Sequence, residues 1–336
     1  MRWSVEQAKD VVRAARRVAA AIGLGLSLLP AAVWPATPVP ATQQNLPFSQ
    51  ALDLRAVVEA TTSPPQALLA TLARWGVDVR VVRAPGDGRA RNPLLAGVPE
   101  AGADLLRQAE FRESYEGRLV CRGDRCCGLA RDTILIRETA STYTLLHEFI
   151  HAQLQPLCPA SSPDDEIEQR FGAAHRRLQL YQRRLYDDPY KLLDPRWRRD
   201  IHSAQADVVQ DLFDRIRFGQ AQEVIAEVLL ARHVTEDSPY HDRRRRDEGR
   251  RYAVAMVDNA IDLVNQVEAS IAFVEEAVRH LRAEVLAGRI VTGEGVALDD
   301  AQALQVAQDG ARLRERLAPT REEVLRLKAF AAAVVH

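Results

Sequence analysis

The chain has 336 residues, of which 47% are hydrophobic and 27% are charged, a balance typical of a globular protein and unlike that of a disordered one. Its formal net charge of −1 argues against a general nucleic-acid binder. The one strongly basic run, Arg243–Arg246, is flanked by Asp242 and Asp247, as expected for a solvated helix start.

Residues 1–47 resemble a secretory signal peptide or a membrane anchor followed by a Pro-rich linker. Basic residues precede an uncharged, mostly apolar run from Val18 to Trp34, and small residues then lie among prolines. The run is short for a membrane span and contains Pro30, which favours a cleaved signal. We therefore expect an exported protein, periplasmic or extracellular, with an N-terminal membrane anchor or a cytoplasmic location as alternatives.

Residues 48–158 are expected to form an N-terminal α/β part. Pro65–Trp75 has the pattern of a helix, and Val77–Val82 alternates apolar with polar residues as a strand does. Further strands are expected near Arg118–Cys121 and over Asp132–Arg137. These strands would complete a small sheet.

The next predicted helix carries two histidines one turn apart. From His147 to His151 it reads His-Glu-Phe-Ile-His, and side chains four residues apart share one helix face. Two imidazoles on that face can bind one metal ion, as in a zinc hydrolase. Ser141 and Thr142 are suitable N-cap residues, and Pro156 ends the helix. Apolar residues on the other flank predict packing into a core: Leu145, Leu146, Phe149 and Ile150.

The stretch from Thr144 to Leu154 resembles the active-site helix of the zincin metallopeptidases. Metzincins have glycine and histidine at the positions that Leu154 and Leu157 occupy here, so a metzincin is excluded. The gluzincin branch instead takes its third ligand from a glutamate on a later helix, followed four residues on by an acid that holds a ligand imidazole. Glu223-Val-Ile-Ala-Glu227 has this form.

The resemblance therefore implies that Zn²⁺ is bound by His147, His151 and Glu223, with Glu227 orienting a ligand ring from behind. The separation of Glu223 from the motif is longer than in the minimal gluzincin arrangement, and a Glu pair with this spacing is also common on solvated helix faces. The other candidates for the third ligand are Glu227 itself, His175, His233, Glu166 and Glu168.

The same resemblance implies a fold and an activity. The fold is α+β and predominantly helical, with a zincin-like core made of a small N-terminal sheet, the active-site helix and a C-terminal helical bundle. The activity is peptide hydrolysis, in which the metal activates a water and Glu148 is the general base. An extended peptide or protein substrate would pair with an edge strand of the sheet. Tyr240-His241 or Tyr252 could stabilise the oxyanion.

Residues 159–336 are expected to be helical and to carry the third ligand. A long charged helical stretch is broken near Pro189 and Pro195. Apolar residues from Val254 to Val285 keep near-heptad spacing, typical of an intramolecular bundle seam and less often of a dimer. A last helix is predicted to begin at Thr320, where Thr320 and Glu323 form a capping box after Pro319.

Four cysteines, an even number, agree with export. Cys121, Cys126, Cys127 and Cys158 could form two disulfides, one of which would tie the end of the active helix to the preceding turn. A cysteine zinc site is less favoured, because the spacing lacks the paired CxxC form.

Two rival functions remain open. Glu148 and His151 also form an ExxH, the half-motif of di-iron helical bundles, but the chain has no second one, and Glu276 with His280 comes closest. The other rival is a non-catalytic helical metal-binding or interaction protein. The sequence does not indicate the oligomeric state.

Overall fold

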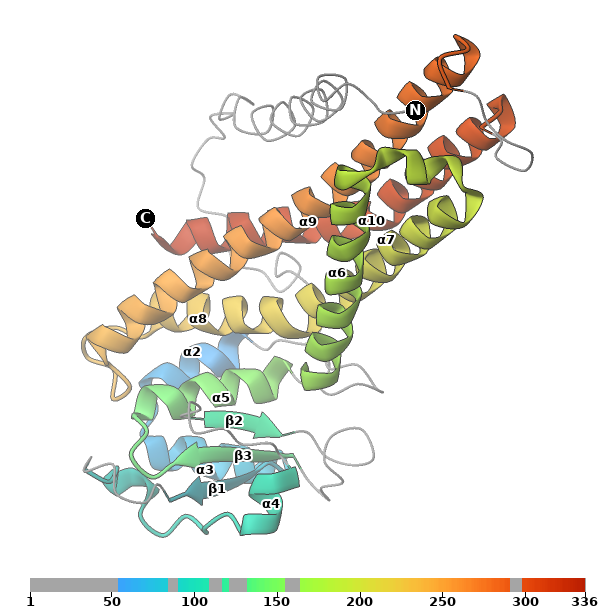
Figure 1. Ribbon diagram of the computed structural model, residues 1–336. Helices are drawn as coiled ribbons and strands as arrows, with labels where there is room; N and C mark the ends of the chain where they lie inside the picture. The colour runs from blue at the N-terminus through green and yellow to red at the C-terminus, as the bar shows by residue number, and fades with distance from the viewer. Residues whose placement is uncertain are drawn as a thin grey trace. The chain divides into compact units, whose positions relative to one another are not determined.

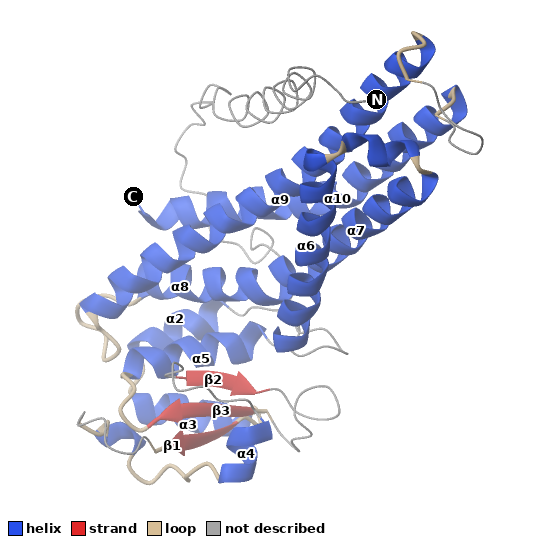
Figure 2. Cartoon of the chain, in the orientation of Figure 1, coloured by secondary structure: helices blue, strands red, loops and turns tan. Residues whose placement is uncertain are grey.

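The computed structural model describes residues 54–83, 90–108, 117–120, 132–154, 164–290 and 298–335. It is predominantly helical with one small sheet, so the α+β class expected from the sequence is confirmed (Figures 1 and 2). The targeting segment expected at 1–47, the four cysteines, Pro156 and the expected domain borders at 47 and 158 lie outside the described residues. Within the described part, no helix has both the length and the apolar character needed to cross a bilayer.

The helices, in chain order, are α2 (Leu54–Thr62), α3 (Pro65–Arg74), α4 (Ala103–Gln108), α5 (Thr142–Leu154), α6 (Asp164–Asp187), α7 (Pro195–Arg215), α8 (Ala221–His233), α9 (Arg243–Leu286) and α10 (Asp300–Val335). Short 3-10 helices occur at η2 (Pro93–Leu95) and η4 (Pro189–Leu193), and η5 (Ile216–Gln220) is a π-helical stretch between α7 and α8. The predicted breaks at Pro189 and Pro195 are thus confirmed, and each proline opens the element that follows it.

The chain forms two compact units, each built from separate stretches. Of the described residues, the first unit contains Ile167–Arg215 and the residues from Asn259 to Glu322. The second contains the residues up to Glu166, Ile216–Asp258 and the end of α10 from Glu323.

The sheet lies in the second unit, and the described residues contribute three strands to it: β1 (Asp78–Val82), β2 (Gly117–Val120) and β3 (Thr133–Arg137). Their order is β1-β3-β2, with β1 parallel and β2 antiparallel to β3. The predicted strands are confirmed to within one residue at each end. The run at 132–137 forms the central strand, which explains its almost continuous apolar sequence, and β2 is an edge strand of this sheet.

Helix α5 packs between the sheet and α8 (Figure 1). Ile134 and Ile136 of β3 belong to the main core with α5, whereas Leu135 points to the opposite face and packs near α4. The main core also contains apolar residues of α2, α3 and α8. Burial against these elements holds α5 in place, and α5 carries the histidine motif.

In the first unit, the apolar seam of α9 is buried as an intramolecular seam, with residues such as Val264, Ile271 and Val278 almost inaccessible to solvent. Polar contacts connect the helices: Gln205 of α7 donates to Ser270 of α9 at 3.0 Å, and Arg314 of α10 forms a bidentate ion pair with Glu275 of α9 at 2.8 and 2.7 Å.

The predicted helix start at Thr320 is wrong. Helix α10 continues through Pro319, and Thr320 is fully buried in its interior. An interior proline costs about 3 kcal/mol. Buried residues nevertheless repeat along the helix at spacings of three and four without a gap at the proline: Leu313, Leu317, Thr320, Val324, Leu327 and Ala331. Each buried Leu or Val contributes roughly 1.5–3 kcal/mol. The burial of this apolar face therefore exceeds the cost of the proline.

Candidate metal centre

Helix α5 presents His147 and His151 on one face, with their Nε2 atoms 2.9 Å apart. The predicted N-cap is present, because the Ser141 hydroxyl accepts a hydrogen bond from the Thr144 backbone N–H at 3.3 Å. The apolar flank is buried as expected, so the helix cannot rotate without exposing it. The two imidazole side chains are only 14% and 10% exposed.

Helix α8 brings Glu223 to the two histidines. Glu223 Oε2 lies 3.4 Å from His147 Nε2, and Glu223 Oε1 lies 3.4 Å from His151 Nε2. The Glu223 side chain is 36% exposed, so the group opens to solvent on this side. The π-helical stretch η5 directly precedes α8, and such stretches occur frequently at functional sites.

Glu227, one turn after Glu223, lies behind His147. Its Oε1 is 3.0 Å from His147 Nδ1, and its Oε2 accepts a hydrogen bond from the Tyr143 hydroxyl at 2.9 Å. Sequence reasoning placed Glu227 here by resemblance but missed Tyr143. The available signal was its position four residues before His147, which puts both side chains on one helix face.

The charges in this cluster are strongly coupled. Burial alone would lower the pKa of His147, but hydrogen bonds and charge interactions with Glu223 and Glu227 hold it well above its usual value. Burial likewise opposes the pKa shift of Glu223, yet His151 and His147 hold it well below its usual value. Burial, reinforced by the charge of Glu227, raises the pKa of Tyr143, so its hydroxyl stays a donor.

The donor atoms fit a metal ion. His147, His151 and Glu223 each offer one ligand atom, and these atoms lie within 4.8 Å of one another. A tetrahedral ion with bonds of ~2.0–2.1 Å has donors roughly 3.3 Å apart, close to the two His–Glu separations of 3.4 Å and somewhat wider than the His–His separation. Two imidazoles and a carboxylate are also a donor set of catalytic zinc sites. This group could therefore hold a metal ion.

Glu148 lies beside the edge strand β2. It is only 5% exposed, and a Cβ on Gly117 would come within 2.9 Å of both its Cγ and its Oε1. The carboxylate therefore occupies the space that a side chain at residue 117 would fill.

The other candidate residues do not join the group. Among the described residues, one set of potential ligand side chains could hold a metal, and it consists of His147, His151 and Glu223. This set does not include the other candidates, namely Glu166, Glu168, His175 and His233. Glu168 instead forms an ion pair with Arg215 at 2.7 Å, and His175 stacks on Phe171. A second carboxylate-histidine set for a di-iron site is likewise not found in the described part.

The tyrosines suggested for oxyanion stabilisation differ in burial. Tyr240 is fully buried in the main core of the second unit, whereas Tyr252 is 49% exposed. The role suggested for Tyr240-His241 or Tyr252 stays a prediction.

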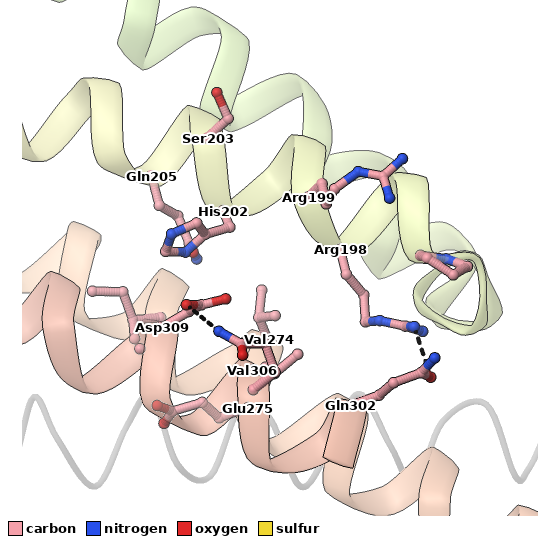
Figure 3. Close-up of a pocket in the computed structure, with 14 residues that line it drawn as sticks. Arg198, Arg199, His202, Ser203, Gln205, Val274, Glu275, Gln302, Val306 and Asp309 are labelled. Atoms are coloured by element: carbon pink, nitrogen blue, oxygen red, sulfur yellow. Dashed lines mark hydrogen bonds between the residues drawn. The ribbon is translucent and has the colours of Figure 1, made fainter. Parts of the chain in front are cut away.

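A groove of about 290 Å³ lies between α7, α9 and α10 in the first unit (Figure 3). Its most buried charge, Arg198, donates to the carbonyl oxygens of Leu192 and Leu193 and to Gln302 Oε1 at 2.6–3.0 Å. The Glu275 carboxylate in its wall is paired with Arg314. These contacts stabilise the packing of the helices.

Comparisons with models of known protein families, with curated proteins and with solved structures find no match to this chain.

Proposed function

We propose that this protein is a zincin-like metallopeptidase that binds Zn²⁺ through His147, His151 and Glu223 and uses Glu148 as general base. One observation carries the proposal: ring nitrogens from α5 and a carboxylate from α8 converge at metal-ligand separations, although Glu223 follows His151 by 72 positions in the chain. Chance surface residues rarely converge in this way at a largely buried position.

A bound Zn²⁺ would supply a Lewis acid that lowers the pKa of a water to about 7 and polarises a scissile carbonyl. The chain's own residues handle the proton. The Glu148 carboxylate accepts it from the attacking water as the water oxygen bonds to the carbonyl carbon, and then donates it to the amine nitrogen as the C–N bond breaks, so that the products are a carboxylic acid and an amine. Glu227 keeps the His147 ring oriented during both steps.

A peptide is the substrate class that the surroundings favour. Strand β2 is an edge strand of the described sheet and lies beside α5, with Gly117 against Glu148. An extended peptide can add to a strand edge through main-chain hydrogen bonds, which would bring its carbonyl groups near Glu148. The signal-like pattern of residues 1–47 supports the further proposal that the enzyme acts outside the cytoplasm, either free or anchored.

The alternative function is a non-catalytic metal-binding or interaction protein, and Glu148→Gln separates it from a peptidase. We expect one zinc per chain in both the wild type and this variant, because Glu148 is not a ligand. Hydrolysis of a mixed peptide library, followed by mass spectrometry, should fall about 10²–10⁴-fold in the variant.

Zinc binding without hydrolysis in the wild type would instead support the non-catalytic alternative. Two irons per chain would support a di-iron bundle, and a protein that binds no metal would overturn the proposal. Glu166→Gln is a matched control, because Glu166 is an exposed carboxylate outside the metal-binding group.

A further inference from the structure

The Glu227 carboxylate is held from three sides within the second unit. Its Oε1 contacts His147 Nδ1 at 3.0 Å, its Oε2 accepts from Tyr143 at 2.9 Å, and the backbone of α9 passes it at Gly249. These contacts come from α5 and α9, two helices distant in sequence. Glu227 itself is not a member of the group that could hold a metal.

We propose that Tyr143 and Gly249 are positioning residues of the metal centre, which act through Glu227 to fix the tautomer and the orientation of the His147 ring. This inference rests on the proposed metal binding by His147. Neither residue touches the reacting atoms.

Tyr143 restricts the rotation of the Glu227 carboxylate group. A phenol at neutral pH is a hydrogen-bond donor, so its O–H occupies Oε2 and leaves Oε1 to accept from His147. By accepting from Nδ1–H, Glu227 leaves Nε2 of His147, which faces His151 and Glu223, as the nitrogen that binds the metal ion once it has lost its proton. Because Tyr143 is only 3% exposed, water cannot readily replace its hydroxyl.

Gly249 provides the space that this carboxylate needs. A Cβ built on Gly249 would overlap Glu227 Oε2 and would lie 2.6 Å from its Cδ. Glycine in a helix interior costs about 1 kcal/mol relative to alanine, so its presence inside the 44-residue helix α9 has a structural reason here. A methyl group would push the carboxylate away from both Tyr143 and His147.

The chain offers a close control for such a clash. Gly310 in α10 of the first unit also faces a carboxylate: a Cβ there would overlap Glu275 Oε1, and Glu275 pairs with Arg314 and not with a metal ligand. Gly310→Ala and Gly249→Ala thus introduce the same kind of steric clash inside a helix. The clash in Gly249→Ala involves Glu227, whereas the clash in Gly310→Ala involves Glu275.

The experiment measures Zn²⁺ affinity of the full chain by competition with a chelator, together with nitrogen-proton NMR of the histidine rings in the metal-free protein. We expect Tyr143→Phe and Gly249→Ala to weaken Zn²⁺ binding about 10–100-fold, as typical for loss of an outer contact to a ligand. Gly310→Ala should leave the affinity unchanged. The His147 ring should be protonated at Nδ1 in the wild type, and its Nδ1–H signal should shift in both variants.

The inference is overturned if the wild type binds Zn²⁺ and both variants bind it equally well with unchanged His147 signals. A wild type that does not bind Zn²⁺ refutes the proposed function instead, and the NMR signals then still decide whether Tyr143 and Gly249 hold the ring. If Gly249→Ala fails to fold, Tyr143→Phe carries the test. In a Glu227→Gln background, Tyr143→Phe should have no further effect on Zn²⁺ affinity. If the role of Tyr143 were purely structural, its substitution would weaken Zn²⁺ binding further in that background.

Discussion

Gly117 and Glu148 show how the absence of one side chain can make room for the proposed general base. Because a Cβ at residue 117 would lie 2.9 Å from the Glu148 side chain, a side chain there would force the carboxylate or the strand backbone to move. The sequence identified Glu148 from its motif, but the role of Gly117 depends on a strand that approaches α5 in space. Motif spacing contains no such information.

We expect Gly117→Ala to lower kcat by at least about tenfold, since a displacement of a catalytic group by 1 Å can cost about 10²-fold. Zinc affinity should stay near the wild-type value, because Glu148 is not a ligand. Gly102→Ala is the control, since no heavy atom lies within 4 Å of its added methyl group. Steady-state kinetics and zinc content measured on both variants test this, and full activity of Gly117→Ala would contradict it.

The metal-free protein should show a pH dependence that reflects the coupled site. The pKa of His147 is raised despite its burial, so its contribution to stability is complete below about 6.5 and is lost as the pH rises through the raised value. The pKa of Glu223 is lowered, so the contribution of this carboxylate to stability is complete above about pH 4.3 and is lost as the pH falls through the lowered pKa. The pair thus stabilises the metal-free fold most between these limits.

Thermal unfolding in a chelator should therefore give a higher Tm at pH 6 than at pH 9, with a smaller difference in Glu223→Gln. Equal pH profiles for the two proteins would contradict the coupling.

Among the elements of the described residues, the local sequence pattern predicted most helices and all three strands, and it failed where tertiary packing determines the structure. The strands at 77–82 and 132–137 were recognised from composition, yet their parallel pairing joins residues 55 positions apart, as in Asp78 with Thr133 (133 minus 78). A capping box after a proline is a strong local stop signal, but the buried seam on both sides of Pro319 keeps α10 continuous.

Replacing Pro319 with alanine should stabilise the protein by about 2 kcal/mol. The gain comes from removal of an interior helix proline, which costs about 3 kcal/mol. The same substitution increases the conformational entropy of the unfolded chain, which offsets about 0.4–1 kcal/mol of this gain. Denaturant unfolding measures the change. If α10 were instead two helices with a start at Thr320, the substitution would be neutral or destabilising.

At the scale of the whole molecule, the sequence predicted the fold class and the residues of the candidate site, whereas the two units could not be derived. Each unit combines stretches that are far apart in the chain. Helix α9 contributes to both units, and the border between them lies between Asp258 and Asn259. No periodicity marks that border, because the heptad seam runs through it. Tyr143 and Gly249 were missed for the same reason, since their roles come from contacts between α5, α8 and α9.

X-ray absorption at the zinc K-edge of the purified full chain reports the atoms bound to the ion, and it can therefore show whether two imidazoles and a carboxylate hold zinc in this protein. We expect one zinc with nitrogen and oxygen neighbours at ~2.0–2.1 Å, including imidazole scattering from two rings, and loss of bound zinc in His151→Ala. A sulfur shell at about 2.3 Å, which would indicate a cysteine site, or zinc retained in that variant would contradict it.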